Sequence, residues 1–156
     1  MELLHKRLES ETGHDAAYAL LQQHLGSLPE ICRTPQGKPY FPTEPLHFSI
    51  SHTKHHAFCC VHTENVGMDA EECDRDLPLS LARRILSPAE QRRFAAAPNP
   101  REALLRLWVL KEALAKLTGR GWGDWLKLTD FSPDDPRIQC IDGCFVAVLK
   151  ESDHAV

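Results

Sequence analysis

Asn-Pro-Arg-Glu-Ala-Leu-Leu-Arg-Leu-Trp-Val-Leu-Lys-Glu-Ala-Leu-Ala-Lys-Leu-Thr-Gly-Arg-Gly, residues 99–121, is the segment around which the chain is organised. It predicts a helix, because Asn99 is a favourable N-cap, Pro100 suits the first helical position and Gly119 is a typical stop. Glu102 is expected to complete a capping box with Asn99. One face of this helix is expected to be buried as an apolar stripe, formed by Ala103, Leu107, Leu110, Leu114 and Leu117.

A second face of the same helix carries Trp108, Glu112 and Lys116 at intervals of four residues. Taken alone, Glu112 and Lys116 are typical of a surface ion pair, which contributes roughly 0.2–0.5 kcal/mol. The acidic strand predicted at residues 66–71, Val-Gly-Met-Asp-Ala-Glu, changes that interpretation. Alternation places Asp69 and Glu71 on one face of this strand, about 6.6–6.8 Å apart between Cα atoms. Their hard oxygens suit Mg²⁺, with Glu112 as a third oxygen ligand and Lys116 as a phosphate contact.

An Asp-x-Glu pair alone is a weak signal, and it fits a solvated strand end equally well. Two further segments could bind an anionic ligand. Ser51-His52 ends a predicted strand and could donate to a phosphate, and Gly37-Lys38-Pro39 could place backbone and an ammonium against a nucleotide. Each alone is typical of an ordinary turn or surface histidine.

The remaining pattern predicts an α+β fold. Helices are expected at 14–25, 79–86 and from Ser87 to about Ala97, where Ser87 and Glu90 form a capping box. Strands are expected at 46–51 and 57–61 as a hairpin, and at 66–71, 126–131, 138–141 and 144–149. A helix followed by antiparallel strands occurs in both halves. We therefore expect two similar halves in a pseudo-twofold arrangement, 1–65 and 66–156, each with antiparallel strands packed against helices.

Size and charge limit the function classes. The 156 residues suffice for a substantial core, and the net charge of −4 argues against a nucleic-acid-binding protein. Residues 64–76 hold six acids and one base, whereas residues 83–106 hold six arginines and two acids. No secretory leader or membrane-spanning run is evident, so we expect a cytoplasmic protein with reduced cysteines and no membrane partner.

Together these segments resemble the 4′-phosphopantetheinyl transferases. That family's signature is Val/Ile-Gly-x-Asp-x-Glu, some forty residues, and then Trp-x-x-Lys-Glu-Ala-x-x-Lys before a glycine-rich turn. Here it stands as Val66 to Glu71 and Trp108 to Gly119, with Gly37-Lys38-Pro39, Ile50-Ser51-His52 and Leu86-Ser-Pro-Ala-Glu90 as further similar segments. The likeness is to the two-lobed, surfactin-synthetase-activating type, in a compact form. The chain stops at His154-Ala-Val, where another strand could begin.

The resemblance implies transfer of phosphopantetheine from CoA to a serine of an apo carrier protein, or of a carrier domain in a fatty-acid, polyketide or peptide synthase. It implies that Asp69, Glu71 and Glu112 bind Mg²⁺, or Mn²⁺, and that Glu112 is the general base. The other implied CoA contacts are Lys38, Pro39, Ser51, His52 and Lys116, with Asp69 beside them; Arg33 is a further candidate for the 3′-phosphate. Asp69, Glu112 and Lys116 are thereby the expected catalytic residues.

Three alternatives remain open from the residues themselves. A Mg²⁺-dependent nuclease could use Asp69 and Glu71, although Cys73 stands where such sites usually have a lysine. A zinc site could form from histidines and cysteines of residues 52–62, although their spacing fits no standard pattern. The third is a non-catalytic CoA-binding module. For the transferase, the basic residues 83–106 are expected to attract an acidic carrier, so that charge reversal at Arg83 and Arg92 would slow its association.

Overall fold

The computed structural model describes residues 1–154. In chain order the elements are β1 (Glu2–Arg7), α1 (Gly13–Leu25), β2 (Cys32–Arg33), β3 (Pro39–Tyr40), β4 (His47–His52), β5 (His56–His62), β6 (Val66–Glu72), the 3₁₀ helix η1 (Leu79–Leu81), α2 (Ala82–Ile85), α3 (Pro88–Ala96), α4 (Pro100–Thr118), the 3₁₀ helix η2 (Asp124–Leu128), β7 (Ile138–Ile141), β8 (Cys144–Lys150) and the 3₁₀ helix η3 (Glu151–Asp153). The fold is therefore of the expected α+β class.

Two three-stranded antiparallel sheets form the centre of the molecule, in the orders β1-β5-β4 and β6-β8-β7. Each sheet has the same construction in sequence: a strand, a helix and then a hairpin whose second strand lies in the middle. Strands β2 and β3 form a separate two-stranded ribbon above the first sheet. The predicted hairpins at 46–61 and 138–149 are both confirmed.

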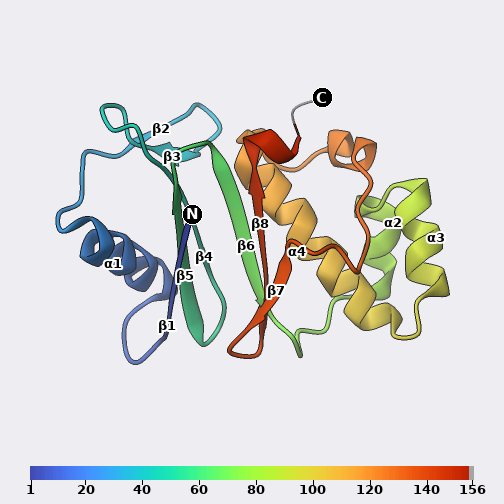
Figure 1. The fold of residues 1–156 in the computed structure, drawn as a ribbon. Coiled ribbons are helices and arrows are strands. Elements are labelled where there is room, and N and C mark those ends of the chain that lie inside the picture. Colours follow the sequence, from blue (N-terminus) through green and yellow to red (C-terminus); the bar gives the residue numbers. More distant parts are fainter. Residues whose placement is uncertain (155–156) are drawn as a thin grey trace.

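The elements are arranged in layers, with α1 and α4 on opposite sides of the strands (Figure 1). Alternation along β5 explains this arrangement, because neighbouring residues face different cores. Cys59 and Val61 pack with Leu21 of α1, whereas Phe58 and Cys60 pack against the second sheet. The adjacent cysteines thus lie on opposite faces, as predicted.

Serine side chains join the two sheets where β4 meets β6. Ser49 Oγ accepts a hydrogen bond from the Met68 amide at 2.9 Å, and Ser51 Oγ accepts one from the Ala70 amide at 3.1 Å. These hydroxyls take the place of carbonyl groups in a backbone ladder, so buried amides of β6 remain satisfied. The junction fixes the position of the acidic strand relative to the first half of the chain.

Helix α4 packs so closely on β6 that Gly67 has no room for a side chain. A Cβ at this position would lie 2.1 Å from the Ala113 carbonyl oxygen and 2.2 Å from the Leu117 amide nitrogen. This contact gives a physical reason for glycine beside the acidic residues. The helix ends as predicted at Gly119, whose φ of 67° is readily adopted by glycine.

A buried ion pair holds α4 to α3. The Lys111 ammonium lies 2.9 Å from the Glu90 carboxylate, and both side chains are fully buried. Lys111 also donates to the carbonyls of Leu126 and Thr129 at 2.6 Å, while Glu90 accepts from the Phe131 amide. Glu90 also completes the predicted capping box at the start of α3. Lys111 of the signature and Glu90 of the segment before it therefore have a structural role in this fold.

Two expectations about local structure were wrong, and one element was missed. Residues 126–131 do not form a strand, because their backbone groups bind Lys111 and Glu90 instead of a neighbouring strand. The capping box at Asn99 is incomplete: Asn99 accepts from the Glu102 amide, but the Glu102 carboxylate accepts from Arg106. The first strand, β1, was not predicted.

The suggested strand from His154 falls on residues 155–156, outside the described part, and His154 itself lies in a turn. No helix within residues 1–154 is both long and apolar enough to span a membrane.

Candidate active site

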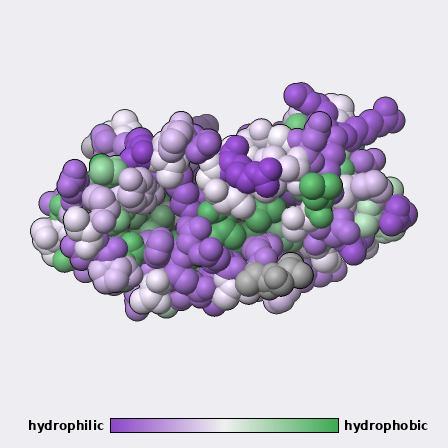
Figure 2. Space-filling model, turned by 90° about the horizontal axis from the view of Figure 1, so that it is seen from above, coloured by the Kyte–Doolittle hydropathy of each residue, from purple (hydrophilic) through white to green (hydrophobic). Residues whose placement is uncertain are grey.

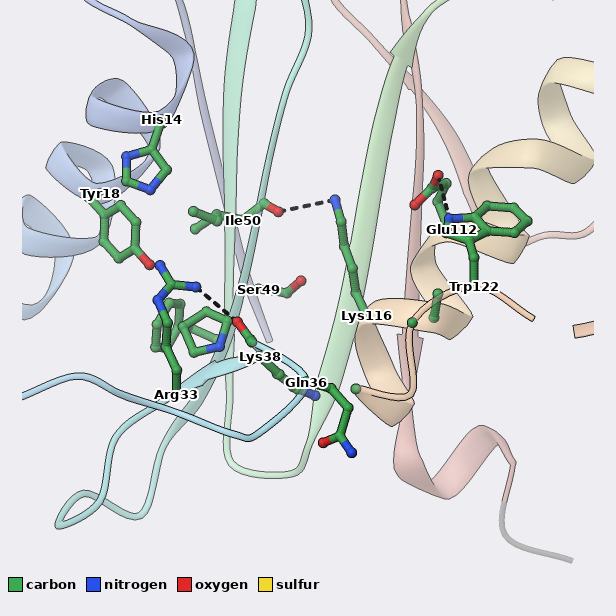
Figure 3. Close-up of a pocket in the computed structure, with 16 residues that line it drawn as sticks. His14, Tyr18, Arg33, Gln36, Lys38, Ser49, Ile50, Glu112, Lys116 and Trp122 are labelled. Atoms are coloured by element: carbon green, nitrogen blue, oxygen red, sulfur yellow. Dashed lines mark hydrogen bonds between the residues drawn. The ribbon is translucent and has the colours of Figure 1, made fainter. Parts of the chain in front are cut away.

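A cavity of about 320 Å³ opens at the junction of β4 and β6, between α1 and α4. Its apolar wall includes Tyr18, Pro39, Phe48 and Ile50. Its polar wall includes Arg33, Glu112 and Lys116 (Figure 3). From above, the molecular surface is mainly polar, with apolar residues showing between polar ones near its middle (Figure 2). Apolar walls with a few convergent charged groups are typical of small-molecule sites.

Asp69 lies beside this cavity with only 6% of its surface exposed. Its Oδ1 accepts hydrogen bonds from Ser51 Oγ at 3.1 Å and from Lys116 Nζ at 2.9 Å. Its Oδ2 is buried and has no hydrogen-bond partner among the described residues. A buried carboxylate oxygen without a partner is costly, so this atom is suited to a cation.

Glu71 and Glu112 are each held by a tryptophan. Trp108 Nε1 donates to Glu71 Oε1 at 3.1 Å, and Trp122 Nε1 donates to Glu112 Oε1 at 3.0 Å (Figure 3). Glu71 also forms an ion pair with Arg75. Glu112 and Lys116 do not form the surface ion pair that their spacing alone allows, because the Lys116 ammonium pairs with Asp69 and also donates to the Ile50 carbonyl.

Burial and the nearby charge of Asp69 raise the pKa of both glutamates. Burial, followed by the charge of Asp69, raises the pKa of Glu112 to about 7. The same two causes, in the same order, raise the pKa of Glu71. Carboxyl groups whose charges are mutually unfavourable accommodate a bound cation well.

The three carboxylates are neighbours, but they do not form an assembled ligand cluster. Within residues 1–154 no group of three histidine, cysteine or acidic side chains is arranged to hold a metal ion. The indole and guanidinium donors instead occupy one oxygen of Glu71 and one of Glu112. The donor set fits Mg²⁺ or Mn²⁺ chemically, because all its atoms are carboxylate oxygens and Asp69 offers a vacant one.

Of the predicted CoA-binding residues, some line the cavity and others are bound to groups within the protein. The Lys38 stem and Pro39 line the cavity. The Lys38 ammonium, however, donates to Asn65 Oδ1, the Val66 carbonyl and the Leu117 carbonyl at 2.5, 3.3 and 2.7 Å. Burial lowers the pKa of Lys38 to about 8. This lysine therefore ties the 34–38 turn to the end of α4.

Ser51 and His52 also have positions that the sequence did not reveal. The buried Ser51 hydroxyl points at Asp69 and holds it, rather than lining the cavity. His52 lies outside the cavity lining and packs against Gly13 at the start of α1. Arg33 lines the cavity and donates to the Gly37 carbonyl at 2.9 Å, which leaves its other guanidinium donors available.

Sequence reasoning missed Trp122 and the α1 face formed by His14 and Tyr18, all of which line the cavity. A tryptophan between glycines after a helix end was an available signal for Trp122. For the α1 pair, the signal was two aromatic rings four residues apart.

A second, open groove of about 660 Å³ lies on the other side of Trp122. We call it the basic groove, because Arg83, Arg84 and Lys127 line it together with Trp108; Asp124 also lines it and pairs with Lys127 at 3.7 Å. Of the other arginines of the predicted basic face, Arg92 lies on α3 outside the groove lining and three have partners within the chain. Arg93 donates to the Phe131 carbonyl, Arg101 pairs with Asp76 and Arg106 pairs with Glu102. The basic surface that is available to a partner is therefore smaller than the sequence suggested.

Comparisons with known proteins identify the family to which this chain is similar. Residues 65–144 match the model of the 4′-phosphopantetheinyl transferase superfamily. The chain is 33% identical over 129 residues to a 4′-phosphopantetheinyl transferase of Bacillus subtilis, covering 76% of this chain and 56% of that protein. It is 36% identical over 109 residues to the 4′-phosphopantetheinyl transferase AcpT of Salmonella typhi, covering 67% and 57%.

It is also 35% identical over 88 residues to the 4′-phosphopantetheinyl transferase psf-1 of Bacillus pumilus, covering 54% of this chain and 37% of that protein. The chain thus spans roughly a third to just over half of the length of these relatives. The matched residues 65–144 include β6 and α4, and hence all three carboxylates.

Proposed function

We propose, because this chain belongs to the 4′-phosphopantetheinyl transferase superfamily, that it transfers the 4′-phosphopantetheine group from CoA to a serine of an apo carrier protein. The observation that carries the proposal is a cavity lined by Glu112 and Lys116, with the buried Asp69 paired to Lys116 and close enough to Glu112 to raise its pKa. In the reaction, a bond forms between the serine oxygen and the β-phosphorus of CoA. The bond from that phosphorus to the bridging oxygen breaks, and 3′,5′-ADP leaves.

Asp69, Glu71 and Glu112 are the residues that would hold Mg²⁺ or Mn²⁺. When bound, the ion would neutralise charge on the diphosphate, which is the main requirement of phosphoryl transfer. Support comes from the vacant Oδ2 of Asp69 and from the raised pKa of Glu71 and Glu112. To ligate through both oxygens, each glutamate must give up the indole hydrogen bond that its Oε1 now accepts.

Glu112 is the proposed general base. Its pKa of about 7 suits a group that accepts a proton from the serine hydroxyl, directly or through water, at neutral pH. Lys116 supplies a positive charge to the diphosphate, and its bond to Ile50 together with its pair with Asp69 already places its ammonium between β4 and β6. Asp69, Glu112 and Lys116 are therefore the proposed catalytic residues.

CoA binding is assigned to the cavity between α1 and α4. Arg33 and Lys116 are the proposed phosphate contacts, and Pro39, Phe48 and Tyr18 offer an apolar surface to the adenosine. Direct contacts from Lys38 and His52 to phosphate stay predictions, since Lys38 is bound to three protein oxygens and His52 lies beyond the cavity lining. Ser51 acts through Asp69.

The carrier protein is assigned to the basic groove. An acidic carrier would meet Arg83, Arg84 and Lys127, and its serine would approach Glu112 past Trp122. Because charges at the rim act mainly on association, Arg83→Glu with Arg84→Glu should raise the carrier KM and weaken its salt dependence. CoA affinity should stay unchanged. Arg92→Glu, on α3 outside the groove lining, is the matched control that separates this groove from a general basic face.

The division into a CoA-binding half (1–65) and a catalytic half (66–156), with a pseudo-twofold relation between them, is part of the same proposal. The repeated order of strands and helix in the two sheets supports it. A cytoplasmic location also stays a prediction.

Release of 3′,5′-ADP tests the proposed activity. The protein is incubated with CoA, Mg²⁺ and an apo carrier, and the nucleotide is measured by chromatography. We expect release only when the carrier keeps its serine, with a serine-to-alanine carrier as the control. Equal release with both carriers would instead indicate hydrolysis of CoA and would contradict a transferase.

A further inference from the structure

Trp122 stands between the two cavities of the candidate site. It lines the cavity of about 320 Å³ that holds Lys116, and it lines the basic groove of about 660 Å³ as well. The side chain is 44% exposed, although tryptophan is strongly apolar. An indole in this position separates the place assigned to CoA from the place assigned to the carrier.

Two contacts hold the indole in this position. Its Nε1 donates to Glu112 Oε1 at 3.0 Å (Figure 3), and its ring stacks on Trp108 with centroids 4.9 Å apart and planes 23° apart. Trp108 in turn donates to Glu71 Oε1 at 3.1 Å. The stacked pair therefore occupies one oxygen on each of two proposed metal ligands.

The backbone around Trp122 permits the ring to move. Gly119 and Gly121 precede it with φ angles of 67° and 72°, and Gly123 follows it. Glycine adopts both signs of φ at little cost, so this segment can change conformation without the strain that a side chain would add. The segment lies between the end of α4 and η2, outside the helices and sheets.

We propose that Trp122 is a positioning residue that can move: its indole holds Glu112 Oε1 in the metal-free protein and swings away when Glu112 binds a divalent cation through both carboxylate oxygens. The swing breaks one hydrogen bond and one aromatic stack, and it joins the two cavities at Glu112. This inference rests on the proposed function, because it takes Glu112 to be a metal ligand.

Circular dichroism of the stacked indoles reports the swing. Since the chain has three tryptophans, Trp125→Phe leaves Trp108 and Trp122 as the remaining pair. Stacked indoles couple their transitions, and the resulting couplet disappears when they separate. Mn²⁺ alone is titrated into this protein, and its binding is followed independently by the paramagnetic resonance of free Mn²⁺. We expect the couplet to disappear in proportion to bound Mn²⁺.

Trp122→Phe tests the hydrogen bond separately. Phenylalanine keeps an aromatic ring against Trp108 but cannot donate to Glu112, so Mn²⁺ no longer competes with an N–H group. Affinity for Mn²⁺ should rise by about 3- to 10-fold, in keeping with the loss of a hydrogen bond to a partly exposed carboxylate. Trp125→Phe is the matched control, because Trp125 Nε1 donates to the Gly121 carbonyl instead, and its Mn²⁺ affinity should match the wild type.

The outcomes separate the two claims. A couplet that persists at Mn²⁺ saturation, or an unchanged Mn²⁺ affinity in Trp122→Phe, would overturn the proposed movement of Trp122 and would leave the proposed function in place. Failure of the wild-type protein to bind Mn²⁺ would overturn the proposed metal site, and the inference with it.

Discussion

Replacing Glu112 by glutamine should stabilise the metal-free protein at pH 8 while abolishing transfer. The carboxyl has a pKa of about 7 in the folded protein, against an ordinary value of 4.5. At about 1.36 kcal/mol per pH unit, that difference corresponds to about 3.4 kcal/mol of destabilisation when Glu112 is ionised. Because the side chain is partly exposed, solvent screening reduces this value, and we expect a gain of about 1–2 kcal/mol.

The sign of this effect depends on pH. Between pH 4.5 and about 7 the folded protein holds the proton that the unfolded chain has released, so wild-type stability falls as the pH rises through this window. The destabilisation by Glu112 is absent below pH 4.5 and complete above about pH 7. The stability of Glu112→Gln should therefore equal that of the wild type near pH 4.5 and exceed it at pH 8.

Thermal unfolding without metal measures the difference. For a chain of this size, a gain of about 1–2 kcal/mol raises Tm by roughly 2–8 °C. Glu102→Gln is the control on the same helix. It loses the pair with Arg106 and the negative charge in the first turn of α4, so it should lower stability at pH 8, by about 0.2–0.5 kcal/mol for the pair, instead of raising it. A Glu112→Gln protein no more stable than the wild type at pH 8, or stabilised equally at pH 4.5, would refute the electrostatic argument.

Further predictions concern the residues around this carboxylate. Affinity for Mn²⁺ should fall about tenfold per pH unit below pH 7, because the metal must displace the Glu112 proton. Equal Mn²⁺ affinities in titrations at pH 6 and pH 8 would contradict this. Ser51→Ala should cost about 1–3 kcal/mol in urea unfolding and slow transfer, since it leaves the Ala70 amide unpaired and frees Asp69. Gly67→Ala should cost about 3 kcal/mol or more because its Cβ meets α4 backbone, and a Tm equal to the wild type would disprove that packing. Lys38→Met should lower Tm, and a changed CoA Kd at unchanged Tm would show that the ammonium serves CoA rather than α4.

The catalytic elements could be predicted because their local signals agree with the final packing. The caps and apolar stripe of residues 99–119 specify a helix with a buried face, although the structure also buries residues outside that stripe, such as Leu104, Leu105 and Val109. Alternation in 66–71 specifies which carboxylates face this helix. Neither prediction needs a long-range contact. The tertiary structure then only has to bring the acidic face of β6 against α4, and the close approach at Gly67 achieves this.

The failures arose where a long-range polar contact determines the structure. Residues 126–131 have strand-like residues, but Lys111 and Glu90 bind their backbone groups, and nothing in the local pattern encodes that pair. The Lys38 ammonium was assigned to a phosphate from its motif, whereas the fold places the Leu117 carbonyl within 2.7 Å of it. A lysine between glycine and proline does not reveal which acceptor it will meet.

Charge counts along the sequence were similarly coarse. The stretch 83–106 has a clear basic excess, but intramolecular partners occupy Arg93, Arg101 and Arg106. Only the structure shows that Arg83 and Arg84 lie together beside Trp122. The predicted carrier surface is accordingly smaller and closer to Glu112 than the sequence alone indicated.

The intact mass of a panel of apo carriers, measured after incubation with this protein, CoA and Mg²⁺, tests the central claim most directly. We predict that at least one carrier gains the mass of a single phosphopantetheine with the wild-type protein and with Glu102→Gln, and that none does so with folded Glu112→Gln or after chelation of the metal. Modification by the folded Glu112→Gln protein at the wild-type rate would contradict the account, as would a panel of fatty-acid, polyketide and peptide-synthase carriers that the wild-type protein leaves unmodified.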